Sequence, residues 1–159
     1  MRNLVALLYL TLGVAPSIQA QKEAVVTNHA RGTFDVKVIP QAADDIAGGP
    51  FSRLFLDKQF HGDLEATSKG QMLGAPTAVE GSAGYVALEL VSGNLHGRHG
   101  SFILQHNGTM TKGVPTMTVA VVPNSGTDQL TSLAGRMTII IADGKHSYEF
   151  EYTLGGPQR

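Results

Sequence analysis

Apolar and polar residues alternate with a period of two along most of this chain, and no stretch has a sustained helical period. The clearest example is 146–154, HSYEFEYTL, and residues 33–39, TFDVKVI, repeat the pattern. A strand with this alternation buries one face and exposes the other to water. The sequence therefore predicts an all-β fold.

Eight strands are predicted, separated by short turns that contain glycine or proline. They cover 33–39, 53–61, 63–72, 84–92, 100–111, 115–122, 135–142 and 146–154. Such turns leave no room for crossover helices, so successive strands are expected to be antiparallel neighbours. We expect the strands to close into an eight-stranded antiparallel β-barrel, which removes unpaired sheet edges. An open two-sheet sandwich fits the same pattern.

One local signal conflicts with the fifth strand. Asn107-Gly108 is a hairpin dipeptide that would end the strand just after His106. However, the alternation continues through Met110, and Lys112-Gly113 offers a later turn. We therefore expect the longer strand, with Gly108 facing inward where a bulge or a close neighbour needs room.

The connection 123–135, PNSGTDQLTSLAG, differs from the other turns. Thr127 or Asp128 could cap one helical turn there. Leu130 and Leu133 would then pack against one end of the barrel.

The first twenty residues have the layout of a secretory signal peptide. Arg2 precedes an uncharged run over 4–14, and Ala20 ends the segment. The run of about eleven residues is shorter than the roughly twenty that a membrane-spanning helix needs. We expect a signal peptide at 1–20, a tail at 21–29 and a single barrel domain at 30–155, located in the periplasm or secreted.

Composition excludes several classes of partner. The formal charge is −1 and charged residues make up 16% of the chain, so the chain has no basic stripe. We therefore expect that it binds no nucleic acid and that, after signal cleavage, it binds no membrane. No cysteine is present, so stability must come from packing instead of disulfides.

Four segments of the chain carry a family resemblance. They are GTFDVKV from Gly32, FHGDLEA from Phe60, ELVSGNLHGRHGSFILQHNGTM from Glu89 and VVPNSGTDQLTSLAG from Val121. Together they resemble the family known as domain of unknown function 3224, over about residues 30–152. The resemblance implies an allene oxide cyclase-like β-barrel and no particular activity. Because barrels of that type associate, it also implies a homo-oligomer.

His106 is the single imidazole in an apolar row of the fifth strand, Phe102, Leu104, His106, Gly108 and Met110. An eight-stranded barrel is just wide enough to be filled by side chains or to hold one small ligand. If His106 points inward, a neighbouring carboxylate could set its tautomer and support proton transfer. The alternative is a core histidine whose hydrogen bonds are satisfied within the protein.

Glu89 is the candidate carboxylate, and its orientation depends on the register of its strand. Val86, Leu88 and Leu90 form the more apolar row, so they are the expected core face and Glu89 is expected outside in a surface pair. In the other register Tyr85 and Glu89 face inward, and the buried carboxylate needs a partner.

The candidate catalytic residues are therefore His106 and Glu89. No cofactor is expected, because no nucleotide-binding motif occurs, and the absence of a G-x-S-x-G motif counts against a serine hydrolase. No metal is expected either, because His96 and His99 span a glycine-rich turn that fixes no ligand geometry. The candidate ligand-binding residues are Phe102, Leu104, Gln105, Glu65 and Tyr85.

The expected function is binding of a small apolar molecule inside the barrel. One alternative is a cofactor-independent cyclase or isomerase that uses His106 with a carboxylate. The other is a structural or oligomerising envelope protein with a solidly packed barrel.

Overall fold

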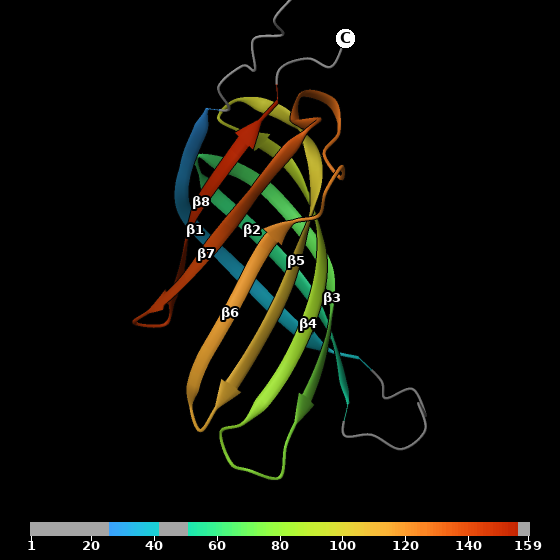
Figure 1. The fold of residues 1–159 in the computed structure, drawn as a ribbon, viewed down its shortest axis with the longest axis vertical. Coiled ribbons are helices and arrows are strands. Elements are labelled where there is room, and N and C mark those ends of the chain that lie inside the picture. Colours follow the sequence, from blue (N-terminus) through green and yellow to red (C-terminus); the bar gives the residue numbers. More distant parts are fainter. Residues whose placement is uncertain (1–25, 42–50, 156–159) are drawn as a thin grey trace, which may run out of the picture.

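A computed structural model describes residues 26–41 and 51–155, and it shows eight antiparallel strands that close into a barrel (Figure 1). Each strand pairs with the next, and β8 pairs with β1, so the predicted barrel is confirmed and the two-sheet alternative is wrong. The predicted signal peptide and residues 21–25 of the predicted tail lie outside the described residues. The strands are β1 Thr27–Pro40, β2 Ser52–Gly62, β3 Leu64–Pro76, β4 Ala83–Leu95, β5 Arg98–Thr111, β6 Val114–Val121, β7 Leu133–Ala142 and β8 Lys145–Leu154.

β5 continues through Asn107-Gly108, as predicted, and the chain turns at Lys112-Gly113, where both residues have positive φ. Gly108 faces inward and is buried. A Cβ at Gly108 would lie only 2.1 Å from Cε1 of Tyr85, so the tyrosine ring occupies the space that a side chain would need. The hairpin dipeptide is overridden because its glycine is needed for close packing within the barrel.

One half of the barrel is filled by side chains. Phe60 and Tyr148 meet edge to face with ring centroids 5.7 Å apart, and Phe102 stacks on Phe150 at 5.9 Å. The predicted helical turn is a 3-10 turn, Asp128–Leu130, whose Leu130 is 1% exposed at this end. No helix in the described ranges is long and apolar enough to cross a membrane.

The barrel wall is incomplete at the other end. Within the described residues, β6 and β7 share one residue pair, Ala120 with Arg136. β8 pairs with β1 only as far as His146 with Phe34. The β7–β8 hairpin therefore diverges from the lower end of β6 in Figure 1. We call this end the open half and the other end the closed half. The open half is formed by residues 35–40 of β1, residues 114–119 of β6, the N-terminal ends of β2 and β4 and the C-terminal ends of β3 and β5.

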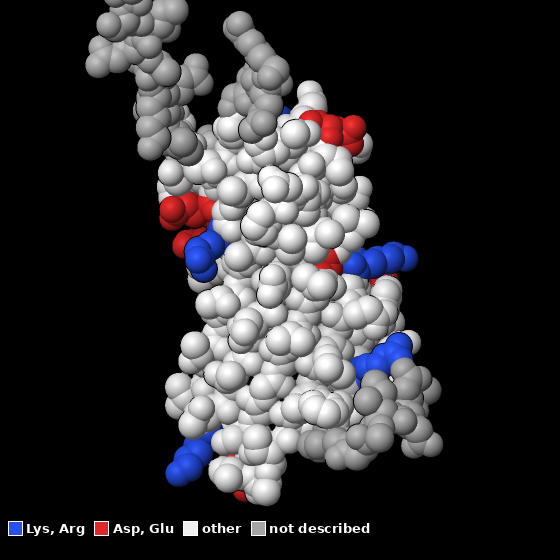
Figure 2. Space-filling view, turned by 45° about the vertical axis from the view of Figure 1, so that its right-hand side comes forward, with Lys and Arg blue, Asp and Glu red and all other residues white. Residues whose placement is uncertain are grey.

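The predicted register of β4 is wrong. Val86, Leu88 and Leu90 lie outside and are about half exposed, whereas Tyr85 and Glu89 face inward with Ala87 and Val91. Figure 2 shows that charged side chains are sparse on the side of the barrel where β3 and β4 lie. The outer row of β4 is thus as apolar as a core face, while the inner row contains an ionised group that has partners inside the barrel.

Candidate functional site

Four polar side chains from four neighbouring strands meet inside the barrel. Lys58 comes from β2, Ser68 from β3, Glu89 from β4 and His106 from β5, and each is at most 6% exposed. Along β2, Lys58 lies two residues from the buried Phe60 of the closed half. The polar cluster therefore lies where the aromatic core ends and the open half begins.

The Glu89 carboxylate is the centre of this cluster. Its Oε1 accepts hydrogen bonds from Lys58 Nζ at 2.9 Å and from His106 Nε2 at 2.8 Å. Its Oε2 accepts a hydrogen bond from Ser68 Oγ at 2.9 Å. A buried carboxylate with a charged partner and further donors is satisfied, whereas one without them would be strongly destabilising.

The charge state of Glu89 follows from these contacts. Burial alone raises the pKa of a carboxyl group, because the charged form loses its hydration. The hydrogen bond from His106 and the positive charge of Lys58 outweigh burial and lower the pKa of Glu89 from 4.5 to about 2. Glu89 is therefore ionised at neutral pH, and the cluster contains a buried ion pair.

A glycine makes room for this carboxylate. Gly70 on β3 pairs with Glu89 on β4. A Cβ at Gly70 would lie 2.5 Å from the Leu88 carbonyl oxygen and 2.6 Å from the Glu89 Cβ. No side chain fits at this distance, so only glycine at position 70 lets the neighbouring backbone of β4 keep its place beside Glu89.

Gly70→Ala is therefore expected to destabilise the protein by about 1–3 kcal/mol, because the added methyl group meets backbone atoms that cannot move aside easily. The matched control is Gly84→Ala, where the nearest atom to the new Cβ is 3.9 Å away. Chemical denaturation of both variants measures the difference. Equal stability of the two variants would contradict the close approach at Gly70.

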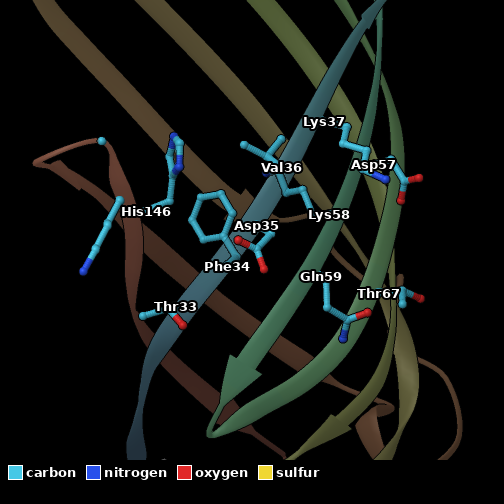
Figure 3. A pocket seen from close by; sticks show the side chains of 12 residues that line it. Thr33, Phe34, Asp35, Val36, Lys37, Asp57, Lys58, Gln59, Thr67 and His146 are labelled. Atoms are coloured by element: carbon cyan, nitrogen blue, oxygen red, sulfur yellow. The ribbon is translucent and has the colours of Figure 1, made fainter.

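Lys58 also faces a pocket of about 780 Å³ in the barrel wall. Its ammonium group lies 5.1 Å from the ring centroid of Phe34 and 5.8 Å from that of Phe60, in cation–π range. Figure 3 shows Phe34, Val36 and Lys58 together in this pocket, with His146 on the far side of Phe34. The pocket is lined from both faces of β1, because β8 begins at Lys145 and, among the described residues, pairs with β1 no further than Phe34.

The inward row of the open half is apolar and partly exposed. Met117 is 37% exposed and Met110 39%. The side chain of Tyr85 on β4 extends over Gly108 on β5, and its hydroxyl group donates to Met117 Sδ on β6 at 2.9 Å. Burial, together with the negative charge of Glu89, raises the pKa of Tyr85, so the hydroxyl stays protonated. An apolar surface open to solvent thus lies beside a buried ion pair.

The structure brings some of the predicted site residues together and separates others. His106, Glu89 and Tyr85 lie on the inner face, and Phe102 and Leu104 are core residues at most 1% exposed. Gln105 is exposed on the outer face of β5. Glu65 is exposed on β3 and accepts a hydrogen bond from the Gly62 amide. Neither of these two joins His106.

The histidines of the β4–β5 turn are also accounted for. His96 Nδ1 lies 2.7 Å from the Tyr152 hydroxyl, and Nε2 lies 3.6 Å from Asp63 Oδ2. His99 is exposed. Among the residues that the structure describes, no group of three His, Asp or Glu side chains could hold a metal ion.

Sequence reasoning missed Lys58 and Ser68, which complete the cluster. A signal for Lys58 was present, because it interrupts the alternating row of Leu54, Leu56 and Phe60 on β2 as His106 interrupts its own row. Ser68 is small enough to occupy either face of a strand, and nothing in its neighbourhood marks it.

Comparison with known proteins gives a family and no activity. The family model described as "Protein of unknown function (DUF3224)" matches residues 30–152. A crystal structure of a DUF3224 protein with unknown function from Shewanella oneidensis is 48% identical, with a TM-score of 0.78. The match covers 83% of this chain and 100% of that one. No curated protein matches. The chain therefore belongs to the DUF3224 family, as its four sequence segments indicated.

Proposed function

We propose that this barrel binds a small, largely apolar molecule in its open half, with one polar group of that molecule directed at the buried cluster. The observation that carries the proposal is the position of the cluster. Lys58, Glu89 and His106 form a buried ionic group next to inward-facing apolar side chains that remain partly exposed. Apolar walls with a few convergent polar groups are typical of small-molecule sites.

The closed half supports the same proposal by contrast. Its core residues Phe60, Phe102 and Phe150 are at most 1% exposed, and Phe102 stacks on Phe150. In the open half, Met117 faces inward on β6 but is not covered by β7, which pairs with β6 only at Ala120 within the described residues. A barrel whose only role were structural would gain stability by covering this row.

Met117→Lys tests the proposal, because it places a charge on the inner row at a position that is already partly exposed. Nile red, a neutral apolar dye, is expected to bind the wild type. The variant is expected to bind it at least about tenfold more weakly, because the bound dye would cover the new ammonium group and remove its hydration. Fluorescence titration measures the affinities.

The matched control is Thr118→Lys, the next residue on β6, whose side chain faces outward and is exposed. It is expected to bind the dye like the wild type. If Met117→Lys and Thr118→Lys bind the dye equally well, the dye lies elsewhere and the proposed site is wrong.

The contact between Glu89 and His106 favours a second candidate function, a cofactor-independent isomerase or cyclase. A carboxylate that accepts a hydrogen bond from one ring nitrogen orients the imidazole and leaves the other nitrogen to move a proton. In this case His106→Gln would retain ligand binding and abolish turnover, which proton exchange between solvent and a bound ketone would report in NMR spectra.

A structural or oligomerising role is the third candidate. The exposed outer row Val86, Leu88 and Leu90 offers an apolar contact surface for it. Native mass spectrometry would report both the oligomeric state and any small molecule that is purified with the protein. Export, implied by the N-terminal segment, stays part of the proposal and would be tested by locating the mature protein in cell fractions.

A further inference from the structure

His106 uses only one of its two ring nitrogens within the cluster. Nε2 lies 2.8 Å from Glu89 Oε1. Every buried side-chain nitrogen and oxygen atom of the described residues has a hydrogen-bond partner. Among these residues nothing bonds to Nδ1 of His106. Nδ1 is therefore not fully buried, although the residue as a whole is only 3% exposed.

The position of the imidazole proton follows from the chemistry of its partner. Glu89 is ionised, so its oxygens accept hydrogen bonds and have no proton to donate. The proton in the 2.8 Å contact consequently belongs to Nε2. The charge of Lys58 already offsets that of Glu89, so a neutral imidazole leaves the buried cluster without net charge. Nδ1 of this tautomer carries a lone pair and can only accept.

The cross-strand neighbours of His106 do not provide a donor for that lone pair. Its cross-strand neighbours are Ala87 on β4 and Val119 on β6, both apolar and nearly fully buried. The next inward position on β5, Gly108, is covered by the ring of Tyr85. The hydroxyl hydrogen of Tyr85 is directed at Met117 Sδ. An acceptor left unpaired between apolar walls is costly, so water or a ligand must supply the hydrogen.

We infer that the molecule bound in the open half carries a hydroxyl group on an apolar body, as a phenol or an enol does, and donates that hydrogen to Nδ1 of His106. The inference rests on the proposed function and specifies its ligand class. An ether or an ester lacks the hydrogen. A carboxylate would place a second lone pair opposite Nδ1 and a second negative charge near Glu89.

Three naphthalene derivatives of similar size separate these classes. Binding of 1-naphthol, 1-methoxynaphthalene and 1-naphthoate is measured by calorimetry at pH 7.5. 1-Naphthol is expected to bind about tenfold more tightly than either of the others, because it alone can donate to Nδ1.

His106→Gln locates the effect. Glutamine keeps an N–H donor for Glu89 and removes the ring acceptor. The advantage of 1-naphthol over 1-methoxynaphthalene is expected to disappear in this variant, while the affinity for 1-methoxynaphthalene stays within about twofold of that of the wild type. The matched control is His99→Gln, an exposed position at the start of β5, which should keep the full advantage.

The outcomes separate this inference from the proposed function. Equal binding of 1-naphthol and 1-methoxynaphthalene, or no binding of 1-naphthol by a protein that binds Nile red, overturns the inference alone. No binding of Nile red or of any naphthalene overturns both. Nitrogen-15 NMR of the His106 ring gives a further check that needs neither ligand nor variant. A proton on Nε2 and none on Nδ1 is expected at pH 7.5, and the reverse tautomer contradicts the inference.

Discussion

Replacing Glu89 with alanine is expected to destabilise the barrel by about 3–5 kcal/mol, the usual cost of removing one partner of a buried ion pair. The variant leaves the Lys58 ammonium group, which is 6% exposed, without its counter-charge. It also removes the acceptor for Ser68 and His106. Urea denaturation of the variant and the wild type measures the loss.

A triple variant distinguishes a cluster that is needed for stability from one that is kept for function. In a Ser68→Ala background, in which no buried hydroxyl group loses its acceptor, Lys58→Met, Glu89→Leu and His106→Leu together replace the ionic group by apolar side chains of similar volume. Such replacements are often neutral or stabilising, so we expect the triple variant to be near the wild type in stability and to lose selective ligand binding. A loss below about 1 kcal/mol in Glu89→Ala would show that the cluster is not energetically coupled as the distances indicate.

Lowering the pH is expected to remove the contribution of ionised Glu89 to the free energy of unfolding. The pKa of Glu89 is about 2 in the folded protein against an ordinary value of 4.5, because hydrogen bonding and the Lys58 charge outweigh burial. A carboxyl group whose pKa is lower in the folded than in the unfolded state stabilises the protein at pH values above its unfolded-state pKa. About 3 kcal/mol is therefore present at pH 6 and is lost as the pH falls from about 4.5 through 2. Urea denaturation at several pH values follows this loss.

Glu89→Gln is the control for this titration, because it keeps the shape of the side chain and removes the ionisable group. We expect the variant to be less stable than the wild type at pH 6, and the two unfolding free energies to converge as the pH approaches 2. If the difference between them is the same at pH 2 and pH 6, Glu89 is not the group responsible for the loss.

The fold was predictable from the sequence because the signals that specify it are local. Alternation defines each strand, and short turns such as Lys112-Gly113 force neighbouring strands to be antiparallel. Even the conflict at Asn107-Gly108 could be resolved locally, since the alternation on either side of it is continuous. The number of strands favoured closure but fitted a two-sheet sandwich as well, and the pairing of β8 with β1 decides between them.

The site was predictable only in part, because it depends on which face of each strand is turned inward. Both faces of β4 are rich in apolar residues, and the more apolar one lies outside. The inner position of Glu89 is tolerated because Lys58, 31 residues earlier in the chain, supplies the opposite charge. No local pattern indicates a pairing over that separation. His106 was therefore identified, whereas Glu89 was expected on the wrong face and Lys58 and Ser68 were missed.

The gap in the wall between β6 and β7 has a consequence for kinetics. In a fully closed barrel, a molecule that does not fit through the end can enter only after inter-strand hydrogen bonds break, so exchange waits for local unfolding. Here residues 114–119 of β6 have no such bonds to β7 within the described residues. A molecule that binds the inner row as proposed would not have to break hydrogen bonds between β6 and β7 to enter there, so its association rate would be set by diffusion and orientation instead of by local unfolding.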